Sequence, residues 1–126
     1  MLKISQADFG ELVNAGIAQI PERFLRRLEN VAIVILVEPT ARQLKKLCLG
    51  SEYELFGLYE GVPQTRRGPG YGQVLPDKIT IFKNPILRSA RNQAQIKEIV
   101  RETVWHEIAH HFGSDERGAG KAAKKR

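Results

Sequence analysis

The first twenty residues carry hydrophobic side chains at helical spacing, at Phe9, Leu12, Val13, Ile17 and Ile20. Such a stripe is typical of one face of an amphipathic helix. Ser5, followed by Asp8 three residues later, can cap this helix at its N-terminus. Pro21 then restarts the chain into a short helix with Leu25 and Leu28 on one side. The pattern therefore predicts a long N-terminal helix followed by a short one.

Three later segments have the patterns of strands. The run Val31–Val37 is apolar at every position and rich in β-branched residues, which predicts a strand covered on both faces. A second strand is expected over Leu55–Glu60. Lys78–Lys83 alternates, with Ile79 and Ile81 on one face, which predicts a strand with one fully covered face, at the edge of the sheet.

The segments between these strands differ in kind. Thr40, with Gln43 three residues later, predicts a short capped helix. Residues 61–77 are instead rich in glycine and proline. Loops longer than about 12–15 residues are uncommon in compact domains. This segment is either part of a functional site or a mobile surface loop.

The last long element is predicted to be a central helix. Asn92 and Gln95 form a capping box, and the helix is expected to run to about Phe112, before Gly113 ends it. One apolar stripe consists of Val100, Val104, Ile108 and Phe112, and a second begins with Ile96, Ile99 and Thr103 and continues with His106 and His110. A helix that is apolar on two sides is usually buried, so imidazoles in such a place need an explanation.

Three polar residues of this helix predict a metal site. His106 and His110 are four residues apart and therefore lie on one face, one turn apart, where both imidazoles can reach a zinc ion at about 2.0–2.1 Å. Glu107 projects about 100° from His106, which suits a carboxylate that takes a proton from water acidified by the metal. The alternative is that both histidines are core residues with hydrogen-bond partners.

A catalytic zinc ion needs a third protein ligand and an open fourth position. Gly113 allows the chain to turn back after the helix. Asp115 and Glu116 follow it, and either carboxylate could complete the site.

At these residues the chain resembles the zincin-like metallopeptidases, the small bacterial "minimal zincins". The resemblance includes Leu55–Gly61, Gly70–Gly72, Leu75–Phe82 and His106–Gly113. It implies an α+β fold in which a small mixed β-sheet packs against helices, with the motif on a central helix. It also implies that His106 and His110 bind the metal and that Glu107 is the general base.

The family usually has an aspartate as third ligand, ten residues after the first histidine. In this chain that spacing leads to Glu116, which we take as the third ligand, whereas alignment of the Asp-Glu-Arg string favours Asp115. Substrate is expected to bind to the Gly61–Asp77 loop and along the free edge of the Lys78–Lys83 strand.

The composition of the chain argues against membrane-spanning, secreted and disulfide-bonded proteins. The chain has 126 residues, of which 42% are hydrophobic and 27% charged, as in an ordinary soluble domain. Its longest apolar run, seven residues, is too short to cross a bilayer. The N-terminus lacks the pattern of a secretory signal, and Cys48 is the only cysteine, which excludes an internal disulfide. We expect a cytoplasmic protein that does not bind membranes.

Much of the positive charge is concentrated at the C-terminus. Lys121, Lys124, Lys125 and Arg126 contribute four charges to a net charge of +6, and the rest of the chain therefore carries +2. The sequence predicts one domain over residues 1–117 and a disordered basic tail over residues 118–126. The tail is either a solvated end or a contact for nucleic acid or an acidic partner.

Two functions are consistent with these patterns. The first is a zinc-dependent peptidase that hydrolyses a peptide or protein substrate, with Glu107 as general base. The second is a metal-binding module without proteolytic activity, in which the basic tail could contact a partner. The second is motivated by the irregular third ligand and by the ten residues after Glu116, which are too few for a lower subdomain.

Overall fold

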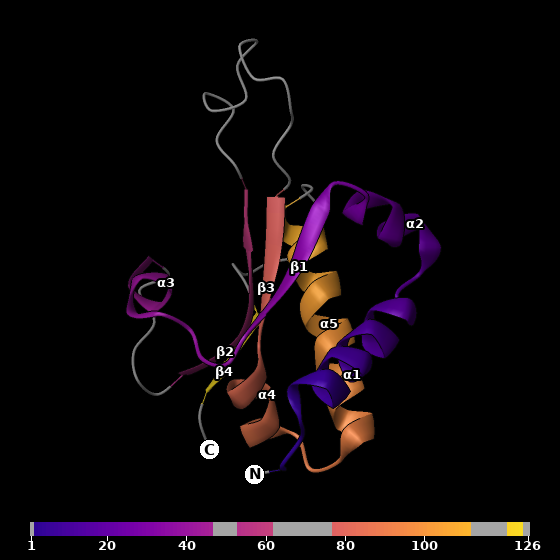
Figure 1. The fold of residues 1–126 in the computed structure, drawn as a ribbon. Coiled ribbons are helices and arrows are strands. Elements are labelled where there is room, and N and C mark those ends of the chain that lie inside the picture. Colours follow the sequence, from indigo (N-terminus) through magenta and orange to yellow (C-terminus); the bar gives the residue numbers. More distant parts are fainter. Residues whose placement is uncertain (1, 47–52, 62–76, 112–120, 125–126) are drawn as a thin grey trace.

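The computed structural model describes residues 2–46, 53–61, 77–111 and 121–124, and the outlines of the fold follow from these segments (Figure 1). Four strands form one sheet in the order β1-β3-β2-β4, and helices pack against both of its faces. This arrangement confirms the predicted α+β class with a small mixed sheet. None of the described helices is long and apolar enough to span a membrane.

The N-terminal helices follow the predicted pattern. Helix α1 (Gln6–Ala18) is capped by Ser5, whose Oγ accepts a hydrogen bond of 3.1 Å from the backbone N–H of Asp8. Pro21 precedes the short helix α2 (Glu22–Leu25), which continues as the 3-10 helix η1 (Arg26–Leu28).

Helix α1 packs closely along helix α5 (Gln93–His111). A Cβ atom at Gly16 of α1 would lie 2.7 Å from the backbone oxygen of Lys97 on α5. The two helix backbones can approach this closely because glycine lacks a side chain.

The strands do not have the places in the sheet that the sequence predicts. Strand β3 (Asp77–Phe82) is central: it pairs in parallel with β1 (Val31–Leu36) and antiparallel with β2 (Tyr53–Glu60). Strand β1 lies at the edge of the described sheet and is half-buried along its length. The prediction that Lys78–Lys83 is an edge strand was therefore wrong. Strand β1, predicted to be covered on both faces, is only partly covered on each: Ile33 and Ile35 pack against the main core and Leu36 against a smaller cluster.

The alternating pattern of β3 was misleading because a polar residue occupies a fully buried position. Thr80 and Phe82 are both 0% exposed, as are Ile79 and Ile81 on the opposite face. Ile79 and Ile81 belong to the main core. A smaller cluster on the other face combines Phe82, Leu55 and Leu58 with the half-buried Leu36 and Leu44.

Two short helices contribute to different clusters: Leu44 packs against the smaller one, whereas Ile86 and Leu87 belong to the main core. Helix α3 (Ala41–Lys46) has the predicted capping box: Thr40 N–H donates to Gln43 Oε1 at 2.9 Å, and Gln43 N–H donates to Thr40 Oγ1 at 3.1 Å. Helix α4 (Lys83–Ser89) was not predicted from the sequence. It begins directly after β3, and its Asn84 N–H donates to the carbonyl of Val37 just beyond β1.

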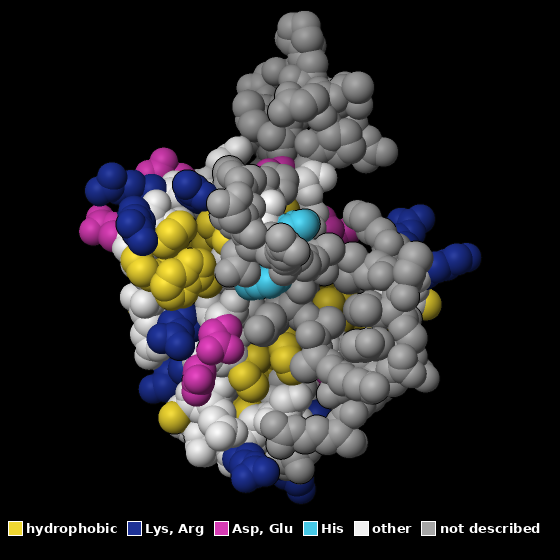
Figure 2. Space-filling view, turned by 180° about the vertical axis from the view of Figure 1, so that it is seen from behind, with side chains coloured by type: hydrophobic (Ala, Val, Ile, Leu, Met, Phe, Trp, Pro, Cys, Tyr) yellow, Lys and Arg dark blue, Asp and Glu magenta, His cyan; other side chains and the backbone are white. Residues whose placement is uncertain are grey.

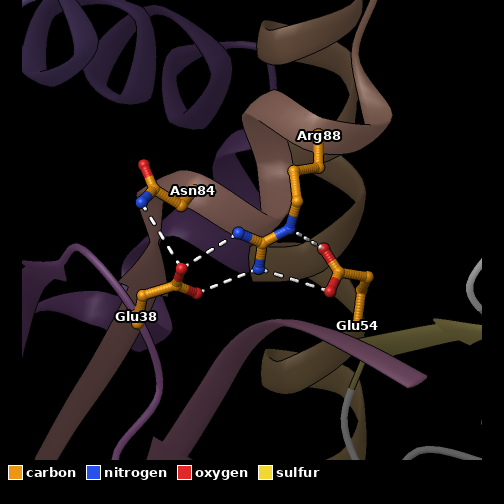
Figure 3. A network of polar contacts seen from close by, with 4 residues as sticks. All are labelled: Glu38, Glu54, Asn84 and Arg88. Carbon is orange, nitrogen blue, oxygen red and sulfur yellow. Dashed lines mark hydrogen bonds and ion pairs between the residues drawn. The ribbon is translucent and has the colours of Figure 1, made fainter. Parts of the chain in front are cut away.

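A network around Arg88 joins α4 to strand β2 and to the segment that follows β1 (Figure 3). Its Nε donates to Glu54 of β2 at 2.7 Å, while Nη1 and Nη2 each donate to Glu38 at 2.9 Å. The Glu54 side chain is only 9% exposed, whereas those of Arg88 and Glu38 are 40% and 47% exposed. Arg88 thereby provides the charged partner that a buried carboxylate requires.

The central helix is the best predicted element. One contact of the predicted capping box of α5 forms as expected, since Gln95 N–H donates to Asn92 Oδ1 at 2.9 Å. The Gln95 side chain, however, accepts from the N–H of Arg91 at 2.7 Å and not from that of Asn92. Its fully buried apolar positions recur every four residues, at Ile96, Val100, Val104 and Ile108.

The C-terminal segment differs in part from the prediction of disorder. Lys121–Lys124 form strand β4, which pairs antiparallel with Tyr53–Gly57 of β2. The rest of the predicted tail lies outside the described residues.

Candidate metal centre

Glu107 occupies the interface between the central helix and the sheet. Glu107 is only 2% exposed. The backbone N–H of Tyr59 on β2 donates a hydrogen bond of 2.7 Å to Glu107 Oε1. The Tyr59 hydroxyl donates in turn to Asp77 Oδ2 of β3 at 2.8 Å. The position of the carboxylate is therefore fixed by contacts from the sheet as well as by its own helix.

Gly57 explains how β2 and α5 come close enough for this contact. A Cβ atom at Gly57 would lie 2.6 Å from Thr103 Cγ2 and 3.1 Å from the backbone oxygen of Thr80. Thr103 lies on α5 one turn before Glu107, and Gly57 lies on β2 two residues before Tyr59. The close approach at Gly57 and Thr103 therefore brings the Tyr59 N–H within reach of the carboxylate.

The two oxygens of Glu107 have different surroundings. Oε1 accepts the Tyr59 hydrogen bond, whereas Oε2 is buried and accepts no hydrogen bond from the described part of the chain. Burial raises the pKa of Glu107, and the Tyr59 hydrogen bond and the charge of His110 oppose this rise. A carboxylate with a raised pKa is a stronger base than one in water.

His106 and His110 lie in the last two turns of α5. His106 is half-buried with its Nε2 atom buried, and His110 is exposed. Histidine side chains of this helix reach the surface in Figure 2. The charge of His110 favours the ionised form of Glu107 and so lowers its pKa, against the larger effect of burial.

These residues fit a zinc ion in their chemistry. Two imidazoles are typical zinc ligands, and the buried Oε2 of Glu107 lacks a donor among the described residues. The described residues contain no group of three potential ligands. Glu116 and Asp115, the two predicted third ligands, both lie outside the described residues, as does the 62–76 part of the predicted substrate loop.

The predicted peptide-binding edge is absent at β3. That strand pairs with β1 on one side and with β2 on the other, so Lys78–Lys83 has no free edge to offer a substrate. The prediction that substrate binds along this strand was therefore wrong, because it assumed that the strand lies at the edge of the sheet.

Comparison with known proteins identifies the family. Residues 28–120 match the family described as Zincin-like metallopeptidase. The chain belongs to this family. A conserved hypothetical protein from Thermo thermophilus has a similar structure, with a TM-score of 0.52 and 24% sequence identity over 86% of this chain and 94% of the other. That likeness supports the fold. No match was found among curated proteins.

Two features of this zincin-like site were missed in the sequence. Nothing local to Tyr59 indicates that its backbone N–H holds Glu107, because the two residues are 48 positions apart. Gly57 carried a usable signal, since a glycine inside a strand often marks a place where another element approaches closely. That signal indicates a close approach without identifying α5 as the element that approaches.

Proposed function

We propose that the protein is a zinc-dependent peptidase in which Glu107 is the general base. The observation that supports this most directly is the environment of that carboxylate. One oxygen is held by the Tyr59 N–H, and the other is buried without a donor among the described residues. Glu107 lies on the same helix as His106 and His110. The family to which the chain belongs is consistent with this chemistry.

In this proposal His106 and His110 hold the zinc ion, with Glu116 as the third ligand and Asp115 as the alternative. When bound, zinc supplies a Lewis acid that polarises the substrate carbonyl and makes water a better nucleophile. Glu107 takes a proton at Oε2 from the water that attacks the carbonyl carbon. It passes this proton to the nitrogen of the leaving amine as the C–N bond breaks. The Tyr59 N–H keeps Oε1 occupied, so that the proton is directed to Oε2.

Glu107→Gln is the decisive substitution because it preserves the size of the side chain. Glutamine retains an oxygen that can accept the Tyr59 hydrogen bond but has no basic oxygen for the proton. We expect the variant to retain zinc and to lose peptidase activity by about 10²–10⁴-fold. Glu102→Gln is a matched control, since Glu102 is an exposed residue of the same helix. Unchanged activity in Glu107→Gln would contradict the proposed mechanism.

A metal-binding module without proteolytic activity is the second candidate. It is favoured by the pairing of β3 on both sides, which removes the expected docking edge for a peptide. A zinc-loaded sample can be screened against a diverse peptide library. Reproducible cleavage that a chelator stops would exclude this candidate.

A further inference from the structure

An aromatic and cationic surface lies where helix α2 meets helix α5. The rings of Phe24 and Trp105 have centroids 5.5 Å apart and are tilted by 43°. The guanidinium carbons of Arg23 and Arg27 lie 4.8 Å and 5.6 Å from the centroid of the Phe24 ring. We call these four residues the aromatic–arginine patch.

This patch is close to the candidate metal centre. Trp105 directly precedes His106, and consecutive Cα atoms are about 3.8 Å apart. Phe24 and Trp105 are half-buried, whereas Arg23 and Arg27 are exposed. Figure 2 shows hydrophobic side chains bordered by Lys and Arg on the same face as the histidine side chains. A peptide bound at the histidines could therefore extend over the patch.

The chemistry of the patch suits a carboxylate beside an apolar group. An arginine stacked on an aromatic ring keeps its N–H groups available for a bidentate contact with a carboxylate. Within the described residues, Arg23 takes part in no ion pair. The partly exposed rings of Phe24 and Trp105 provide an apolar surface next to that guanidinium.

We propose that the aromatic–arginine patch selects peptide substrates that carry Asp or Glu next to an apolar residue. Because Trp105 directly precedes His106, this acidic residue is expected close to the bond that is cut. The inference rests on the proposed peptidase function because it treats the patch as part of the peptide-binding surface.

Trp105 provides a binding signal that does not depend on catalysis, because it is the only tryptophan of the chain. We would titrate the zinc-loaded Glu107→Gln protein with heptapeptides that differ only in Glu, Gln or Lys next to a phenylalanine. We expect a change in tryptophan fluorescence and binding of the Glu peptide about fivefold tighter than that of the Gln peptide, as for one partly exposed ion pair. This preference should decrease as salt is added.

Charge reversal tests whether Arg23 is responsible. Arg23→Glu should remove the preference for the Glu peptide and favour the Lys peptide, whereas Arg23→Lys should keep a weaker preference for Glu. Arg91→Glu is the matched control: it reverses an exposed arginine just before the N-terminus of α5, about 20 Å from Trp105. It should leave the preference for the Glu peptide unchanged.

Cleavage kinetics separate this inference from the proposed function. In protein with an intact Glu107, Arg23→Glu should raise KM for the Glu peptide about fivefold or more with little change in kcat. Equal binding and equal KM for the three peptides, in an enzyme that cleaves them, would overturn the inference and leave the peptidase function intact. Tight binding of the Glu peptide that depends on Arg23, in a protein that cleaves nothing, would support the patch and contradict the peptidase function.

Discussion

The contact between Gly57 and α5 leads to a quantitative prediction for Gly57→Ala. The new Cβ atom would lie 2.6 Å from Thr103 Cγ2 and 3.1 Å from the Thr80 backbone oxygen. Neither neighbour can easily move, because Thr103 is a β-branched residue with 0% exposure on a helix and the Thr80 atom belongs to the central strand.

Two opposing effects determine the size of the change. Overpacking of this kind costs about 1–3 kcal/mol. Replacement of glycine by alanine lowers the entropy of the unfolded chain and recovers about 0.4–1 kcal/mol where the backbone tolerates it. We expect the clash to dominate, so that the free energy of unfolding decreases by about 1–2 kcal/mol.

A double-mutant cycle with Thr103→Ser attributes the loss to one contact. Serine lacks Cγ2 but keeps the hydroxyl, and this substitution alone should cost about 1 kcal/mol for the buried methyl group. In the Gly57→Ala/Thr103→Ser protein the clash is relieved, so the combined loss should be about 1 kcal/mol smaller than the sum of the single losses. Urea denaturation measures all four proteins. Additive losses, or a Gly57→Ala protein as stable as the wild type, would refute the close approach.

Three further predictions concern stability. Gly10→Ala should raise the free energy of unfolding by about 0.5–1 kcal/mol, because a Cβ atom there meets nothing within 4 Å. Gly16→Ala should instead lower the free energy of unfolding by about 1–3 kcal/mol, because its Cβ atom would lie 2.7 Å from the backbone oxygen of Lys97. Denaturant titrations that give both variants the same sign would contradict this assignment. Arg88→Ala should lower the melting temperature through a loss of about 2 kcal/mol, because it removes a cation that bonds the buried Glu54 carboxylate. An unchanged melting temperature would show that the network is dispensable. In metal-free protein, burial raises the pKa of Glu107 in the folded state, so that state keeps the proton to higher pH than the unfolded chain does. Stability should therefore decrease as pH rises from 4.5 toward the folded-state pKa, and Glu107→Gln should flatten this part of the profile; equal slopes in urea titrations would contradict it.

Features that depend on neighbours in the sequence could be predicted. The caps at Ser5, Thr40 and Asn92 each involve a residue three positions later, and all three form. Local spacing also placed His106 and His110 in the last turns of one helix.

Features that depend on distant segments could not be predicted in the same way. The hydrophobic pattern of β1 and β3 could not determine which strand is central, because order in a sheet depends on pairing between strands. Thr80 made β3 resemble a strand with one exposed face, although its side chain is fully buried. The Tyr59 contact that holds Glu107 spans 48 positions and involves a backbone N–H, which no pattern of side chains reveals.

Metal analysis tests the central claim most directly. Protein purified without added metal or chelator should contain about one zinc ion per chain, and His106→Ala and His110→Ala should each lose most of it while remaining folded by circular dichroism. His111→Ala is the control, since residue 111 lies about 140° round the helix from His106, and it should retain the metal. Wild-type protein that takes up no zinc even from excess, or histidine variants that all bind it equally, would contradict the assignment of this helix as a metal-binding element.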